Sequence, residues 1–262
     1  MRFEIRHLTR YRYAAPVRLG PHWLRLNPRE GVALQHDLAI VPQPAYMREE
    51  TDAFGNRVNH LGFEGETRQL TILSRLVGET RQAPPLMDQG PVERYLERTA
   101  GDPAVERMAE RLRALSGPDP AAFAESLTRA LHGMIDHNIR DTGFARPPGE
   151  TLALRAGACR DTAVLFIELC RRAGLPARFV SGYQDKSSRL GERRQMHAWA
   201  EVWLPGEGWV GYDPTRGERV REGHLALAAA PGQAGTMPIE GTFFGTGASA
   251  QMDFALEISA FP

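Results

Sequence analysis

The sequence predicts an α+β protein with two regions of different character. The first 80 or so residues contain several runs in which polar and apolar side chains alternate, as they do in half-buried strands. From about residue 100 onwards, apolar residues instead recur at helical spacing, and a strand–turn–strand pattern follows between residues 197 and 213. We therefore expect a β-rich N-terminal domain at residues 1–85 and a mixed domain at residues 86–262 that ends in a strand.

The N-terminal region predicts a small, sandwich-like antiparallel β domain. Its clearest strand pattern lies at residues 3–13, and further strand-like runs occur at residues 23–26, 37–41 and 69–73. Turn residues at 54–56 and 61–62 separate these runs. Short strands without intervening helices are typical of a sandwich.

The second region follows a proline-rich stretch, Arg81–Pro85, which we interpret as a linker. Asp102-Pro103 and Asp119-Pro120 each combine a helix N-cap with proline at the first helical position. The second pair begins an amphipathic pattern that predicts a helix over residues 120–138. The last 30 residues predict a loop followed by a strand at residues 254–258.

Composition narrows the class of protein. The 262 residues include 32 basic and 32 acidic side chains, so the formal net charge is zero and nothing favours nucleic acid or an anionic membrane as a partner. Two cysteines cannot form a disulfide framework, and the sequence contains neither a secretory h-region nor an apolar run of spanning length. We expect a cytoplasmic protein.

The two cysteines occupy different positions on one predicted helix. Cys159 stands at its first turn, where unpaired N–H groups and the helix dipole favour a thiolate. Cys170 lies eleven residues later, about 16 Å along the helix, among apolar residues. Cys159 is thus the candidate nucleophile, whereas Cys170 is expected to be an inert core thiol. Arg160 either adds positive potential beside the thiolate or is a solvated surface residue, and we expect Asp161 to serve the helix end.

The best candidate base is His197, which begins an alternating strand at residues 197–204. Residues 205–208 form a turn, and residues 209–213 return as a second strand ending in Asp213. If Trp203 pairs with Trp209, Asp213 lies diagonal to His197, within carboxylate-to-imidazole reach. A hairpin shorter by one residue would place Asp213 on the opposite face of the sheet. Contact between His197 and Asp213 therefore requires one particular register of the two strands.

These motifs, in this order, resemble the transglutaminase-like superfamily, in particular bacterial members with a β-rich N-terminal region. The resemblance rests on Gly157–Asp161, on Leu175–Tyr183, on the histidine strand His197–Val202 and on the aspartate strand Gly208–Thr215. Thr9–Tyr13 and Leu24–Arg29 resemble the N-terminal region of such proteins. Two stretches depart from the family pattern: Thr162–Val164 lacks a histidine common in relatives, and Leu225–Gly232 lacks a Gly-Arg-Asp-Tyr segment.

The resemblance implies a papain-like core in which the nucleophile helix packs on an antiparallel sheet. It also implies a Cys159–His197–Asp213 triad that forms a thioester from a peptide or glutamine-type amide. Transfer of the acyl group to water would make the protein a protease or amidase, which we favour, whereas transfer to an amine would make it a cross-linking transglutaminase. We expect a peptide or protein substrate, and neither a cofactor nor a metal.

Three other classes stay open at this stage. An arylamine N-acetyltransferase uses a similar residue set but needs a coenzyme A pocket. A non-catalytic interaction module on the same core is the second alternative. A zinc site is the third, although no closely spaced cysteine and histidine set has ligand spacing.

Overall fold

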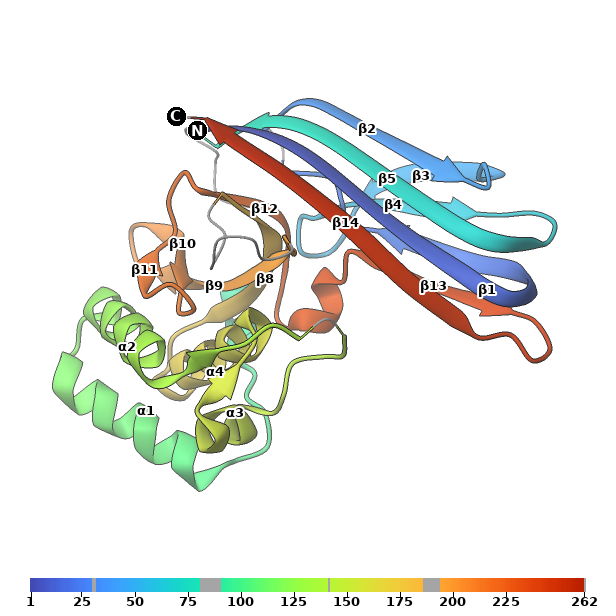
Figure 1. The fold of residues 1–262 in the computed structure, drawn as a ribbon. Helices are drawn as coiled ribbons and strands as arrows, with labels where there is room; N and C mark the ends of the chain where they lie inside the picture. The colour runs from blue at the N-terminus through green and yellow to red at the C-terminus, as the bar shows by residue number, and fades with distance from the viewer. Residues whose placement is uncertain (30–31, 81–90, 141, 186–193, 262) are drawn as a thin grey trace.

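A computed structural model describes residues 1–29, 32–80, 91–140, 142–185 and 194–261. Two antiparallel sheets organise these residues, and the helices pack against the second sheet (Figure 1). The predicted α+β class and the strand-rich N-terminal region are confirmed. The predicted linker and the boundary between residues 85 and 86 lie outside the described residues.

The long strand β1 (Arg2–Leu24) organises the first sheet. Among the described residues this sheet has seven strands, and β1 pairs with four of them: with β5 and β14 along its first half, and with β4 and β13 near its end. The outer strand β2 pairs with β5, and β3 pairs with β4. The bounds of these strands are β2 (Ala33–Val41), β3 (Tyr46–Thr51), β4 (Arg57–Gly62), β5 (Thr67–Glu79), β13 (Ile239–Phe244) and β14 (Ala250–Phe261).

Two details of the strand prediction are wrong, one in the N-terminal region and one near the end of the chain. Leu61-Gly62, expected as a turn, belongs to β4, where strands on both sides satisfy the backbone. The expected loop before the terminal strand contains a 3₁₀ turn, η2 (Gln233–Thr236), and the strand β13. The terminal strand itself is β14, which pairs with β1 over residues 250–261, so the end of the chain completes the sheet that its beginning starts (Figure 1).

The second sheet positions the candidate site. Its described strands have the order β11-β10-β9-β8-β12, and helix α4 packs against β9 and β8. Alternation along β9 directs Ala198, Ala200 and Val202 into this helix-facing core and leaves Trp199 and Glu201 on the other face. The strands are β8 (Ala177–Gln184), β9 (His197–Leu204), β10 (Gly208–Asp213), β11 (Glu218–Arg219) and β12 (His224–Ala230).

The helices that start at Pro103 and Pro120 begin where the sequence indicated. Asp102 accepts hydrogen bonds from the N–H groups of Ala104 and Val105, and Asp119 caps the next helix in the same way. The predicted helix from residue 120 ends at residue 134 rather than 138, because the following backbone becomes extended and pairs in a short two-stranded sheet. The bounds are η1 (Val92–Leu96), α1 (Pro103–Ser116), α2 (Pro120–Met134), β6 (Asp136–His137), α3 (Pro148–Leu154), β7 (Ala156–Gly157) and α4 (Cys159–Arg172).

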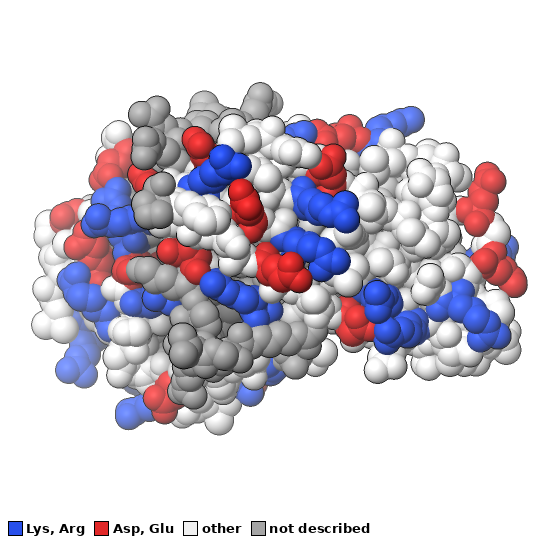
Figure 2. All heavy atoms as spheres, turned by 45° about the horizontal axis from the view of Figure 1, so that its top comes forward, with Lys and Arg blue, Asp and Glu red and all other residues white. Residues whose placement is uncertain are grey.

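None of the helices in the described ranges is long and apolar enough to cross a membrane. On the face drawn in Figure 2, basic and acidic side chains lie interspersed, in agreement with the formal net charge of zero.

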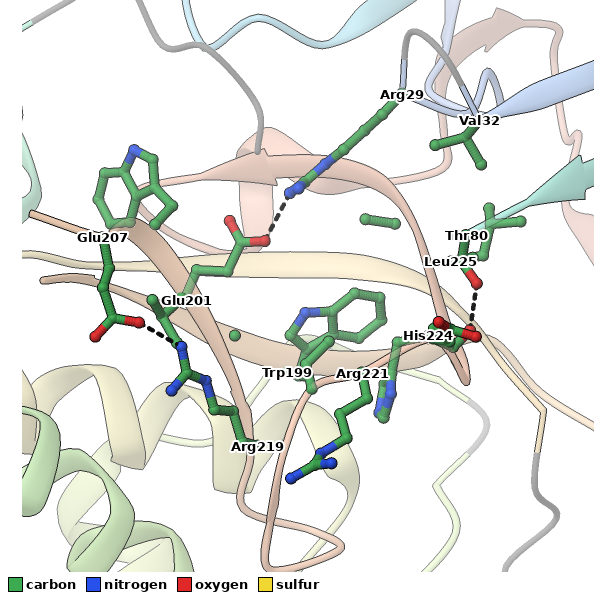
Figure 3. Close-up of a pocket in the computed structure, with 16 residues that line it drawn as sticks. Arg29, Val32, Thr80, Trp199, Glu201, Glu207, Arg219, Arg221, His224 and Leu225 are labelled. Atoms are coloured by element: carbon green, nitrogen blue, oxygen red, sulfur yellow. Dashed lines mark hydrogen bonds and ion pairs between the residues drawn. The ribbon is translucent and has the colours of Figure 1, made fainter. Parts of the chain in front are cut away.

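A buried ion cluster joins the two regions of the chain. Glu201 on β9 accepts a hydrogen bond from Arg29 at 2.9 Å and another from Arg178 of β8 at 2.8 Å. Burial would raise the pKa of Glu201, but the two guanidinium groups outweigh it and the pKa is lowered. Arg178 also stacks over the ring of Trp209, 4.1 Å from its centroid. Arg29 reaches this cluster from the N-terminal region, and with Glu201 it lines a cavity of about 420 Å³ (Figure 3).

We predict that Glu201→Gln destabilises the protein by about 3–5 kcal/mol, because it leaves two buried cations without a carboxylate. The matched control is Glu207→Gln, which removes an exposed partner of Arg219 and should cost no more than about 1 kcal/mol. Urea denaturation of the three proteins measures both changes. Equal effects of the two substitutions would contradict a stabilising role for the buried cluster.

Candidate active site

The local structure around Cys159 places its thiol at the start of a helix. Cys159 is the first residue of α4, and the side chain of Asp161 accepts a hydrogen bond from the N–H of Ala158 at 2.8 Å. The other carboxylate oxygen accepts from the N–H of Arg146 at 2.8 Å and from Arg140 at 2.5 Å. Asp161 therefore serves the helix end and its neighbouring loop, as expected. It stabilises the turn that carries Cys159.

The hairpin register on which the sequence analysis depended is confirmed. Trp209 pairs with Trp203, and the ladder continues to Tyr212 opposite Ala200. The carboxylate of Asp213 consequently lies on the same side as His197, and its Oδ2 is 2.7 Å from Nε2 of the ring. A slip of one residue would have removed this contact.

His197 meets Cys159 as well as Asp213. The imidazole and the backbone N–H of Ala198 both lie close enough to the thiol to lower its pKa by hydrogen bonding. Because Nε2 of His197 is engaged by Asp213, Nδ1 is the ring nitrogen left for the sulfur. The structure thus brings together all three residues selected from the sequence.

The electrostatics of these three groups favour a thiolate–imidazolium pair. Burial would lower the pKa of His197, but the charge and hydrogen bond of Asp213, together with the hydrogen bond of Cys159, raise it to about 10. Burial would raise the pKa of Cys159, but the hydrogen bond and charge of His197 lower it. Burial would likewise raise the pKa of Asp213, but the charge of His197 and the hydrogen bonds from His197 and His224 hold it well below its usual range.

A second histidine, His224, completes the surroundings of Asp213. Its Nε2 lies 2.9 Å from the same carboxylate oxygen that meets His197, and its side chain is buried. The other oxygen of Asp213 accepts from the N–H groups of Thr215 and Arg216 at 3.0 and 3.2 Å. Four hydrogen bonds therefore fix the carboxylate. The sequence analysis missed His224, whose only signal is its place at the start of an apolar run.

The polar atoms of His197, Asp213 and His224 lie within 4.8 Å of one another, as metal ligands also do. However, both ring nitrogens point at one carboxylate oxygen from 2.7 and 2.9 Å. Ligands arranged tetrahedrally around zinc at about 2.0–2.1 Å stand farther apart, at roughly 3.3 Å. The spacing fits direct hydrogen bonds better than a bound zinc ion.

Trp199 and Gly182 support the two histidines from the sheet. Trp199 is buried, with its ring centroid 6.1 Å from that of His197 and 5.2 Å from that of His224. Gly182 pairs with His197 across β8 and β9, and a Cβ there would stand 2.7 Å from the Trp199 ring and 2.2 Å from the carbonyl oxygen of Leu225. Only glycine permits this close approach of β12 to the sheet.

Cys159 and His197 open onto a cleft of about 330 Å³ between the two regions of the chain. Strands β1 and β14 of the first sheet provide one wall, and the start of α4 with residues 140 and 142–143 provides another. The N-terminal sheet therefore shapes the entrance to the candidate site. The lining residues include His7, Thr9, Tyr11, Arg140, Thr142, Arg160, Met196, Met237, Ile239, Met252 and Phe254.

Comparisons with known proteins match both regions of the chain. Residues 107–214 match the family model described as the transglutaminase-like superfamily, and residues 3–79 match the bacterial transglutaminase-like N-terminal region. An uncharacterized protein of Mycobacterium tuberculosis is 28% identical over an alignment of 292 positions. The alignment covers 99% of this chain and 93% of that protein. A protein-glutamine gamma-glutamyltransferase of Pseudomonas aeruginosa is 31% identical over 134 residues, 47% of this chain and 20% of that protein.

A crystal structure from Cytophaga hutchinsonii, described as a candidate cysteine protease, has the same fold. It superposes with a TM-score of 0.71 at 20% identity and covers 99% of this chain and 90% of that one. The likeness extends over both regions, so the neighbour shares the N-terminal sheet as well as the core.

We predict that iodoacetamide alkylates Cys159 much faster than Cys170 in the native protein. The thiolate is the reactive form, and its lowered pKa should keep the rate high below the ordinary thiol midpoint of about 8.5. Cys170 is fully buried, and burial raises the pKa of its thiol. Mass spectrometry of the two cysteine peptides across a pH series measures both rates.

The matched variant is His197→Gln, which removes the cation that stabilises the thiolate. In this variant the pH at which the alkylation rate of Cys159 reaches half its maximum should be higher than in the wild type, while Cys170 stays unlabelled. Equal labelling of the two thiols, or a midpoint that does not respond to the substitution, would contradict the activation of Cys159 by His197.

Proposed function

Because the chain belongs to the transglutaminase-like superfamily, we propose that it is a cysteine-dependent acyl-transfer enzyme acting on peptide or glutamine-type amides. The observation that carries the proposal is the contact chain from the Cys159 thiol through the His197 ring to the Asp213 carboxylate. Such a chain generates a nucleophile and also holds the proton that a departing amine needs. A cleft in front of the sulfur gives an amide room to approach.

In the proposed reaction the Cys159 thiolate attacks the amide carbonyl carbon and forms a carbon–sulfur bond. The oxyanion receives a hydrogen bond from the N–H of Cys159, which is the first helical residue and has no partner within the helix. His197 then transfers its Nδ1 proton to the leaving nitrogen as the carbon–nitrogen bond breaks. Asp213 keeps the opposite ring nitrogen protonated throughout.

The thioester is resolved when His197, now neutral, accepts a proton from the second substrate. Water as this substrate gives a carboxylic acid as the carbon–sulfur bond breaks, and it restores the thiolate–imidazolium pair, so the protein would act as an amidase or protease. We favour this outcome, because a cross-linking enzyme must admit a second protein and exclude water, and no feature of the cleft among the described residues points to such a second site. The compartment we propose is the cytoplasm.

Transfer to an amine is the alternative outcome. It is favoured by the similarity to the Pseudomonas aeruginosa protein-glutamine gamma-glutamyltransferase, which covers 47% of this chain and 20% of that longer protein. The same thioester serves both reactions, so only the identity of the acceptor distinguishes them.

We predict that wild-type protein incubated with glutamine peptides gives a deamidated or cleaved product, and that adding a primary amine changes this product little. Asp213→Asn should reduce the rate by about 10³–10⁴-fold, because the amide holds the wrong histidine tautomer. Mass spectrometry of the peptides measures the products, with Cys159→Ala as the inactive control and circular dichroism as the check on folding.

A product that carries the added amine would assign the transglutaminase alternative. A folded Asp213→Asn protein with wild-type turnover would exclude Asp213 as the residue that orients His197. No covalent change in any peptide would favour a non-catalytic module on this core.

A further inference from the structure

The cleft in front of Cys159 has an excess of positive charge. Arg140 and Arg160 line it, and none of its described lining residues is an aspartate or glutamate. His197 adds a further positive charge that the thiolate balances.

Arg160 is the cation of this cleft that lacks an anionic partner. It follows Cys159 directly, and its Nη2 donates to the carbonyl oxygen of Thr142 at 2.7 Å. Arg140 pairs with Asp161 at 2.5 Å, and Arg146 pairs with Glu150 at 3.2 Å. In the described part of the chain, no carboxylate lies in ion-pair contact with Arg160.

The local field also favours an added anion. Burial lowers the pKa of Arg160, and repulsion from Arg140 and Arg146 lowers it further, whereas Cys159 and Asp161 act in the opposite direction. Three neighbouring cations therefore repel one another beside the nucleophile, with the carboxylate of Asp161 already hydrogen-bonded by Ala158, Arg140 and Arg146. A carboxylate bound there would relieve this repulsion.

We propose that the acyl donor carries a carboxylate close to the reactive amide and that Arg160 binds it. The proposal rests on the proposed function and names the substrate class of that same site: acidic peptides. A guanidinium forms two parallel hydrogen bonds with a carboxylate, so Arg160 would both attract and orient the donor. The opposite wall of the cleft, with Tyr11, Met252 and Phe254, is uncharged and would contact the apolar part of the peptide.

Two alkylating reagents test the preference without any need for turnover. Iodoacetate and iodoacetamide react in the same way: the thiolate attacks the methylene carbon, a carbon–sulfur bond forms and iodide leaves. Only iodoacetate carries a carboxylate next to the attacked carbon. The ratio of the two rates at Cys159, divided by the same ratio for free cysteine, isolates the effect of charge. Changes in thiol pKa cancel, because both reagents require the thiolate.

We expect Arg160→Gln to lower this normalised ratio by about fivefold, the size of a partly exposed ion pair. Added salt should lower the wild-type ratio towards that of the variant. The matched control is Arg111→Gln, which removes one exposed charge from α1 outside the cleft and should leave the ratio unchanged. A wild-type ratio equal to that of free cysteine, or one that Arg160→Gln does not lower, would overturn the proposal.

Peptides then identify the source of the carboxylate. One pair compares glutamine followed by glutamate with glutamine followed by glutamine, and a second compares a C-terminal glutamine with its α-amide. A higher kcat/KM for the acidic member of either pair, lost in Arg160→Gln, supports the proposal and names the source. If no peptide reacts while the iodoacetate preference persists, the proposed reaction fails but carboxylate binding by Arg160 stands. Equal turnover of both members of each pair overturns the proposal.

Discussion

The candidate site depends on one buried carboxylate. Asp213 receives four hydrogen bonds, two from imidazole rings and two from backbone N–H groups, so its position and its negative charge are both fixed. An ionised carboxylate with no exposure to water is costly unless such partners surround it. The charge that results holds a proton on His197, and that proton in turn stabilises the Cys159 thiolate.

The N-terminal sheet contributes to this site although it carries none of the three central residues. Strands β1 and β14 provide one wall of the cleft, and β14 comes from the end of the chain. Arg29 binds Glu201 on the same strand that carries His197. The sheet is thus held against the core by a buried ion pair close to the site.

The sequence was sufficient for features that depend on local pattern. Asp-Pro pairs marked the starts of α1 and α2, and Gly174, with a φ of 81°, ends α4 as expected. The register of the hairpin in which Trp203 pairs with Trp209 could be predicted, because its loop is short and the side chains along its strands alternate between the two faces of the sheet. That single register placed Asp213 beside His197.

Features that depend on distant segments could not be read in this way. His224 reaches Asp213 because the chain after β10 turns back to begin β12, and no local pattern encodes that path. The pairing of β14 with β1 joins residues about as far apart as the chain allows. From the sequence, Arg29 was only one residue of the segment that resembles the family's N-terminal region. Its ion pair with Glu201 depends on how the two sheets pack and could not be predicted from local pattern.

The protonation state of His197 tests the central claim most directly. In ¹⁵N-labelled protein at neutral pH, both ring nitrogens of His197 should show the shifts of an imidazolium, since the raised pKa of about 10 keeps the ring charged. The Cys159→Ala variant should titrate at lower pH, because the ring loses its hydrogen bond to the sulfur. A neutral His197 ring at neutral pH, with one bare nitrogen, would contradict the account.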